Sequence, residues 1–222
     1  MRYVMIAAAA AILMTGCGNA VRTDAESKKQ DCESCIKTLS VVTYHLNDST
    51  YWTEQHQRFC PAAVVFDAWG TEPEGSWHGT FDKSDFSAVG IKGAFMKSLP
   101  GGLMDAVLAE LIYYSFTAGA GFKPTTRAPE PISLQGRRYE SLQVDKINSR
   151  HAITLYRDLT TGRIDWVRIT TAEQQEWMAQ SYNFRYNARL DRMIPRKIDV
   201  FDVHRGIAAK KRLVEFDYIE VQ

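Results

Sequence analysis

The sequence lacks a strong charge imbalance and a hydrophobic run of membrane-spanning length. Lys and Arg number 27 and Asp and Glu number 26, so the formal net charge is +1 at pH 7. A near-neutral chain argues against a nucleic-acid partner. The apolar run at 4–14 is too short to span a membrane, which takes about 20 residues. A second run, at 103–122, is interrupted by Asp105, Glu110 and glycines, and is predicted to be an amphipathic element of a folded domain.

The sequence also lacks the motifs of common catalytic and cofactor sites. It has no Gly-x-Ser-x-Gly elbow, phosphate-binding loop, dinucleotide fingerprint or HExxH helix. Its histidines are scattered, no two of them stand at i, i+4, and strand-surface or turn positions account for them: His45, His56, His78, His151 and His204. We therefore expect a protein that is not an enzyme and that holds no cofactor or metal.

Residues 1–16 have the layout of an export signal. A basic start at Arg2 precedes a short apolar core that ends at Met14-Thr15-Gly16-Cys17. These four residues resemble the bacterial lipobox, although Leu is commoner at the position of Met14. The resemblance implies a lipid anchor on Cys17, held firmly because two or more chains are attached. The residue after Cys17 is Gly18 and not Asp. Under the usual sorting rule for bacterial lipoproteins, this favours anchoring in the outer membrane, with the protein facing the periplasm. The alternative is a signal anchor with an incidental cysteine.

Three further cysteines follow the predicted anchor: Cys32, Cys35 and Cys60. Export places them in an oxidising space, so two of the three are expected to form a structural disulfide, with the pairing open. Cys32 and Cys35 also have redox-motif spacing, but no βαβ pattern surrounds them. A zinc site would need a second pair of ligands. Ile36 after Cys35, where a histidine would be required, excludes haem attachment.

The first half of the exported chain is predicted to be a tether followed by short strands. Residues 17–36 are polar and are predicted to be a tether that includes at most a short helix. From residue 37 the pattern has period two, with Val42, Tyr44 and Leu46 on one face. After a turn at 47–49, strands are predicted at 51–59, 62–69, 75–82 and 84–91.

One strong helix is predicted at 102–117. Its apolar residues have i, i+3, i+4, i+7, i+8 spacing and form one stripe: Met104, Val107, Leu108, Leu111 and Ile112. Asp105 and Glu110 lie off this stripe. The stripe either packs as core or lines a ligand pocket. The same two interpretations apply to the large aromatics Trp52, Trp69, Trp77, Trp166 and Trp177.

The C-terminal part is predicted to be a series of strands after a Pro-rich surface loop at 123–131. The strands are expected at 135–146, 150–157, 163–170, 182–190, 194–203 and 210–221. In the last one, Val214, Phe216 and Tyr218 are expected on one face and Glu215, Asp217 and Ile219 on the other. The predicted fold class is α+β and mainly β: a single domain at 37–222 with a strongly curved antiparallel sheet whose concave face is closed by the helix at 102–117.

Three segments, at 135–146, 151–170 and 182–201, resemble the LolA-like and outer-membrane lipoprotein-sorting family. The resemblance rests on Thr161-Gly162 at a hairpin tip and on Ile194-Pro195-Arg196 before a basic strand. It implies a half-barrel with a helical lid around an apolar cavity that holds acyl chains. Soluble carriers of this family lack an anchor, so Cys17 favours lipid reception or local handling over transport.

The expected function is therefore non-catalytic binding of a lipid or an acylated protein by a membrane-anchored envelope lipoprotein. Two alternatives stay open at this stage. The first is a structural or assembly lipoprotein that binds another envelope protein. The second is a thiol oxidoreductase that uses Cys32 and Cys35.

Overall fold

The computed structural model describes most of one compact unit, Glu33–Gln222. The described residues are 35–45, 50–60, 65–72, 75–82, 85–90, 103, 105–117, 124–127, 131–144, 151–188, 190–203 and 206–221. The predicted signal at 1–16, the residues Cys17, Cys32 and Met104, and almost all of the predicted tether lie outside these ranges.

Thirteen strands form one sheet, and every pairing in it is antiparallel. Its order is β5-β4-β3-β2-β1-β15-β14-β11-β10-β9-β8-β6, with β7 also beside β8. The first five strands are β1 (Ile36–His45), β2 (Thr50–Cys60), β3 (Val65–Glu72), β4 (Gly75–Asp82) and β5 (Asp85–Gly90). The others are β6 (Pro124–Arg127), β7 (Ile132–Leu134), β8 (Arg137–Val144), β9 (Ala152–Asp158), β10 (Ile164–Thr170), β11 (Glu176–Tyr182), β14 (Lys197–Asp202) and β15 (Lys211–Val221).

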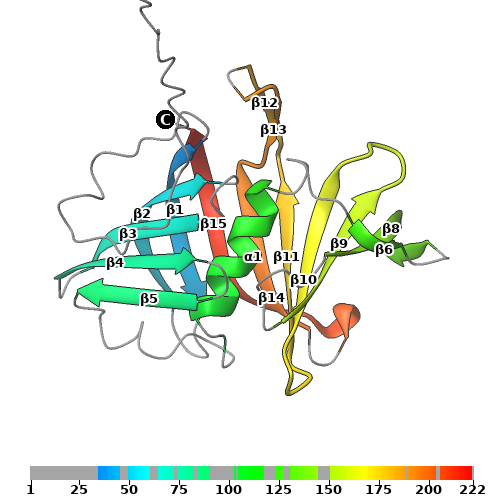
Figure 1. The fold of residues 1–222 in the computed structure, drawn as a ribbon, viewed down its shortest axis with the longest axis horizontal. Coiled ribbons are helices and arrows are strands. Elements are labelled where there is room, and N and C mark those ends of the chain that lie inside the picture. The colour runs from blue at the N-terminus through cyan, green and yellow to red at the C-terminus, as the bar shows by residue number, and fades with distance from the viewer. Residues whose placement is uncertain are drawn as a thin grey trace, which may run out of the picture. The chain divides into compact units, whose positions relative to one another are not determined.

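The single α-helix of the described residues, α1 (Asp105–Thr117), lies inside the curve of this sheet (Figure 1). It contacts β10, β11 and β14 on one side and β2, β4 and β5 on the other. A helix that touches strands so far apart in the sheet order requires the sheet to bend around it. The predicted fold class, a strongly curved antiparallel sheet closed by one helix, is confirmed.

Two hydrophobic cores stabilise the sheet, one on each face. The larger lies between α1 and the concave face and includes Val107, Leu111, Ile169 and Val214. The smaller lies on the convex face, with Ile132 of β7 and Ile207 of the short helix η3 (Ile207–Ala209) packed against it. It consists of Leu134, Tyr139, Tyr156, Trp166, Met178, Phe201 and Val203.

The predicted strand at 182–190 is wrong. The main sheet instead contains β11, whose residues were read as a polar stretch because Glu and Gln surround Trp177. The chain turns at Asn183, which has a φ of 50°, and then forms a separate two-stranded sheet of β12 (Arg185–Asn187) and β13 (Arg192–Ile194). The aromatic alternation that favoured a long strand therefore belongs to a hairpin outside the main sheet.

Two further predictions need correction at the other edge of the sheet. The connector at 123–131 contains the edge strand β6, which pairs with β8 and begins at Pro124, a position that edge strands tolerate. The predicted strand at 135–146 corresponds to β8 but begins two residues too early, because Gln135 and Gly136 have positive φ angles of 49° and 78° and form the turn that joins β7 to β8.

The strict alternation expected in the last strand breaks at Tyr218. The β1–β15 register shifts between Leu39 and Val41, and Tyr218 has a φ of 53°. Tyr218 is 77% exposed, whereas the next residue, Ile219, is fully buried. An extra residue in one strand moves every later side chain to the opposite face, which is the effect of a β-bulge.

Candidate functional site

Helix α1 is buried on all sides. Every residue from Val107 to Thr117 is buried, including those that lie off the predicted stripe. Of that stripe, Val107, Leu108, Leu111 and Ile112 join the main core, while Met104 lies outside the described residues. Glu110, which the sequence places off the stripe, is also buried, at 1% exposed. The curved sheet contacts α1 on two sides, so its burial exceeds what an amphipathic pattern implies.

The concave face of the C-terminal strands is apolar where α1 packs on it. The side chains there form one buried cluster with the helix, and they include Leu142, Ile153, Leu155, Val167, Ile169, Trp177, Ala179, Ile198 and Val200. Interiors of this kind pack at the density of organic crystals. We therefore regard this part of the concave face as structural core.

The concave face of β1 and β2 is different, because uncharged polar side chains cover it. The register pairs Thr38 with Gln57, Ser40 with Gln55, and Val42 with Thr53. All five polar residues are buried. We call the set Thr38, Ser40, Thr53, Gln55 and Gln57 the polar ladder. Alternate residues of a strand share a face, so the polar ladder continues the face that carries the core residues Ile36 and Val42.

Each member of the polar ladder makes a hydrogen bond, either within the set or, for Gln55 and Thr53, to a neighbouring residue of β1 or β2. The Thr38 hydroxyl donates to Oε1 of Gln57 at 2.7 Å, and Nε2 of Gln57 donates to the Ser40 hydroxyl at 2.7 Å. Nε2 of Gln55 donates to the Tyr44 hydroxyl at 2.8 Å. Buried hydroxyl and amide groups are costly unless they are paired. Pairing without charge leaves groups that can exchange partners with a polar ligand atom.

A row of phenylalanines crosses the strands beside the polar ladder. The register places Phe59 of β2 opposite Phe66 of β3, then Phe81 of β4, then Phe86 of β5. Phe59 is fully buried, and its ring stacks on Phe116 of α1 with 4.1 Å between the ring centroids. We call these four register positions the phenylalanine row.

The next two rows differ from each other. Beyond Gln57 the register continues through Ala68, Gly79 and Ala88. Beyond Gln55 it passes through Gly70 of β3, Trp77 of β4 and Gly90 of β5. The register of β2–β5 therefore aligns one row of phenylalanine positions, one row of alanine and glycine positions, and one row that includes Trp77, with the polar ladder on β1 and β2.

A buried polar contact joins α1 to the start of β9. Nδ1 of His151 lies 2.7 Å from Oε2 of Glu110, while Oε1 of Glu110 has no hydrogen-bond partner among the described residues. His151 lies in the bend just before β9 and is partly exposed, and its partner is a buried carboxylate. Burial raises the pKa of the nearby Tyr113 to about 12, against a smaller opposite effect of a hydrogen bond with Thr117. Burial and the Glu110 carboxylate raise the pKa of Tyr114 further.

Cys35 and Cys60 form a disulfide with 4.3 Å between their Cα atoms. It joins the first residues of β1 to the end of β2, next to Phe59. Cys32 lies outside the described residues. Because Cys35 bonds to Cys60, it is not available for a Cys32–Cys35 dithiol in this structure.

The described histidines occupy separate places. His45 Nε2 lies 3.5 Å from a Glu215 carboxylate oxygen, and the His56 ring stacks on Trp69 with 5.5 Å between centroids. The side chains of His78 and His204 lie outside the described residues. Within the described ranges, no group of three or more His, Cys, Asp or Glu is placed to hold a metal ion.

The tryptophans divide between core and surface. Trp166 and Trp177 are buried, Trp52 and Trp69 are exposed, and the side chain of Trp77 lies outside the described residues. Trp177 belongs to the core around α1, and Trp166 belongs to the smaller core on the convex face. No helix among the described residues has the length and the apolar composition that spanning a membrane requires.

Comparisons with known proteins bear on the fold. No family model matches the sequence, and no curated protein matches it. A LolA superfamily protein from Nitrosomonas europaea superposes with a TM-score of 0.56 at 12% identity, over 86% of this chain and 87% of that one. A domain from Vibrio parahaemolyticus, named for outer membrane lipoprotein sorting, gives a TM-score of 0.51 at 10% identity, over 85% of each chain. The chain therefore has a LolA-like fold.

Proposed function

We propose that this protein is an envelope lipoprotein, anchored to the outer membrane through Cys17, that binds an acyl chain of a lipid or of an acylated protein. The binding region is the concave face of β1–β5, and no catalytic step is involved. The lipobox resemblance at Met14–Cys17 supports the anchor, and the LolA-like fold supports the ligand class.

The observation that carries the proposal is the contrast between the cross-strand rows of β1–β5. An acyl chain is a flexible rod that needs an apolar wall and room beside it. The buried Phe59 supplies an apolar wall, and the row that crosses Ala68, Gly79 and Ala88 contains no bulky residue beyond Gln57. Every methylene removed from water contributes about 0.8 kcal/mol, so even a partly enclosed chain binds measurably.

The polar ladder gives the bound chain a direction. An acyl chain ends in an ester, amide or carboxyl group, whose oxygens need hydrogen-bond donors when they leave water. The Thr38 and Ser40 hydroxyls and the Gln57 amide already hydrogen-bond one another. They can turn toward a ligand carbonyl without leaving a charge buried. The headgroup end of the ligand is therefore expected near β1 and β2.

Native mass spectrometry tests the proposal directly. The mature chain from residue 17 carries Cys17→Ser, so that the anchor adds no mass, and it is purified without detergent after expression in a bacterium. We expect a co-purifying acyl lipid, or stoichiometric uptake of added palmitate. A chain that stays free of ligand in both experiments would overturn the proposal.

A matched pair of variants locates the ligand. Gly79→Leu introduces a side chain on the row of alanine and glycine positions, whereas Thr80→Leu places the same side chain on the opposite face of β4. We expect Gly79→Leu to lower palmitate occupancy at least tenfold and Thr80→Leu to leave it unchanged. Equal loss in both folded variants would show that the ligand does not bind on the concave face.

A further inference from the structure

The hairpin of β12 and β13 stands out from the main sheet (Figure 1). Two exposed apolar side chains lie on it. Tyr186 and Met193 are direct cross-strand partners, 61% and 44% exposed. The base of the hairpin is fixed to the domain, because Ile194 and Leu190 pack into the main core. The Arg163 guanidinium also lies 3.9 Å from the ring centroid of Phe184. The hairpin therefore presents Tyr186 and Met193 on a rigid base.

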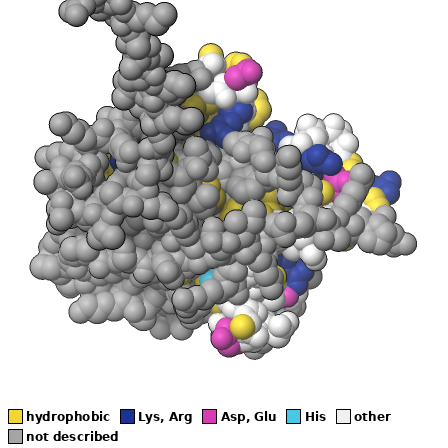
Figure 2. Space-filling model, in the orientation of Figure 1, with side chains coloured by type: hydrophobic (Ala, Val, Ile, Leu, Met, Phe, Trp, Pro, Cys, Tyr) yellow, Lys and Arg dark blue, Asp and Glu magenta, His cyan; other side chains and the backbone are white. Residues whose placement is uncertain are grey.

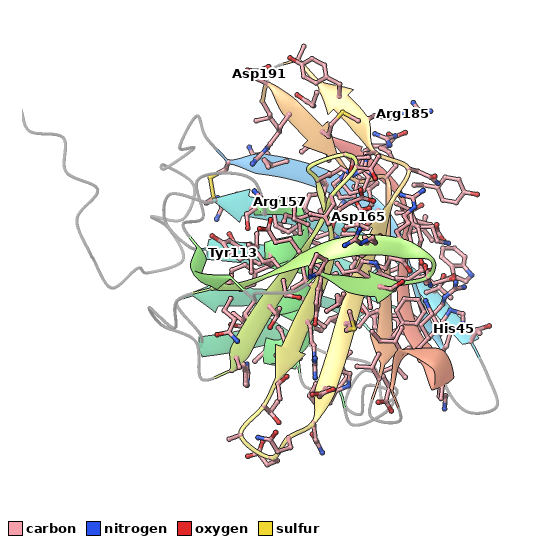
Figure 3. The ribbon with its side chains drawn as sticks, turned by 90° about the vertical axis from the view of Figure 1, so that its right-hand side faces the viewer. His45, Tyr113, Arg157, Asp165, Arg185 and Asp191 are labelled. Atoms are coloured by element: carbon pink, nitrogen blue, oxygen red, sulfur yellow. A yellow bond between two sulfur atoms is a disulfide. The ribbon has the colours of Figure 1, made fainter. Side chains whose placement is uncertain are left out.

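The hairpin segment is strongly basic in a chain that is otherwise near neutral. Between residues 182 and 197 there are five basic residues and one acidic residue, Asp191. The Asp191 carboxylate accepts a hydrogen bond from the Tyr186 hydroxyl. Figure 3 labels Arg185 and Asp191 on this hairpin, away from His45 at the opposite end of the sheet. Figure 2 shows Lys and Arg side chains next to hydrophobic ones in the same region.

Arg192 has no ion-pair partner among the described residues. Its Nε is buried and has no hydrogen-bond partner there, and no carboxylate of the described residues lies within ion-pair distance of it. Burial lowers the pKa of Arg192. An arginine held in this state is stabilised by an incoming anion such as a phosphate.

The position of the β12–β13 hairpin in the fold indicates which anion its arginines meet. The chain from Cys17 enters the folded unit at Cys35, beside the start of β1. The register places the start of β1 next to the end of β15, and the Ile219 amide donates to the Arg196 carbonyl at 3.1 Å. Tyr218, 77% exposed, lies at the same place. The tether therefore joins the domain at the end that carries the basic and aromatic residues.

We infer that this end of the domain, the hairpin of β12 and β13 together with Tyr218, rests on an anionic phospholipid bilayer. Tyr186, Met193 and Tyr218 enter the interface, where amphipathic side chains accumulate. Arg185 and Arg192 bind the lipid phosphates, because basic side chains near an anionic surface are attracted to it. The inference does not depend on a ligand at β1–β5. If it holds, the concave face stays at a fixed height above the membrane that supplies or receives the acyl chain.

Vesicle sedimentation tests this inference with the mature Cys17→Ser chain, which has no anchor of its own. We expect binding to vesicles of phosphatidylethanolamine and phosphatidylglycerol that decreases with salt, and little binding to phosphatidylcholine vesicles. Arg185→Gln with Arg192→Gln should lower the partition coefficient about 25-fold, at about fivefold for each charge. Tyr186→Ser with Met193→Ser should lower it about tenfold, through lost apolar burial.

Trp52→Ser is the matched control, because Trp52 is 64% exposed and lies near the opposite end of the sheet. It should bind as the unchanged chain does. The inference is overturned if the unchanged chain ignores anionic vesicles, or if Trp52→Ser loses as much binding as the hairpin variants. It is also overturned if the hairpin variants keep full vesicle binding and instead lose a protein partner. Circular dichroism confirms that each variant is folded. Palmitate uptake is measured separately on the same variants. A failure of vesicle binding can then be distinguished from a failure of the proposed acyl-chain binding.

Discussion

The two halves of the concave face are built from different side chains although one sheet forms both. Beneath α1, strands β9, β10 and β11 contribute aliphatic residues and Trp177, and the helix closes over them. Strands β1 and β2 contribute the polar ladder, and the register continues from Gln57 into Ala68 and Gly79, and from Gln55 into Gly70 and Trp77. The first half stabilises the curved sheet. The second half is held by hydrogen bonds between uncharged side chains as well as by apolar packing.

The largest effect is expected in the packed half. Trp177→Ala removes a buried indole from the core around α1 and should lower the free energy of unfolding by about 3–5 kcal/mol. Urea denaturation followed by circular dichroism measures it. A loss below about 1 kcal/mol would show that this half is not the packed one, and the comparison would fail.

A slightly smaller effect is expected at the contact between α1 and β9. His151→Ala leaves the Glu110 carboxylate buried without its partner, which should cost about 2–3 kcal/mol. Replacing both residues, Glu110→Leu with His151→Leu, should restore most of that stability, because no charge is then left buried. If the double variant is less stable than His151→Ala, the two side chains do not act as a pair.

The polar ladder should respond weakly and in a ligand-dependent way. Gln57→Leu removes the hydrogen-bond partner of Thr38 and Ser40, and should lower the free energy of unfolding by about 1–2 kcal/mol. Under the proposed function it should also weaken palmitate binding. Lys37→Leu, on the opposite face of β1, is the control for binding. Unchanged palmitate affinity in Gln57→Leu would remove the polar ladder from the binding region.

The smallest effect at ordinary pH concerns the phenol of Tyr113 on α1. Its pKa is raised from 10.0 to about 12 in the folded state, so the folded state holds this proton more tightly than the unfolded state does. The stability that this provides is complete below pH 10 and is lost as the pH rises toward 12. We expect Tyr113→Phe to lose less stability than the unchanged chain between these pH values. Parallel decline of both chains would place Tyr113 outside the buried region.

Sequence patterns predicted the elements whose apolar residues repeat at a regular spacing between clear turn residues. The helix appears at 105–117 within the predicted 102–117, and β4 has the predicted bounds 75–82. The loop after β9 was also predictable, since Gly162 has the positive φ expected of it, 69°. Strand β11 was missed because both of its faces are buried, which hides the alternation that a half-buried strand shows.

The candidate site was harder to predict, for a physical reason. Sequence patterns assign polar residues to solvent, so the polar ladder residues Gln55 and Gln57 gave no signal of burial. Their environment depends on curvature, which comes from long-range strand pairing and not from local sequence. The same holds for Glu110, which lies off the apolar stripe and is nevertheless buried because the sheet contacts α1 on two sides. The phenylalanine row became visible only through the register of four strands.

Hydrogen–deuterium exchange with and without palmitate tests the central claim, that the ligand binds on the β1–β5 half of the concave face. The mature Cys17→Ser chain is exchanged at saturating palmitate and without it. We predict slower amide exchange in β2, β3 and β4 on binding, with β9, β10 and β11 unchanged because their core is already packed. Protection confined to β9–β11, or no change in any strand while palmitate is bound, would contradict the account.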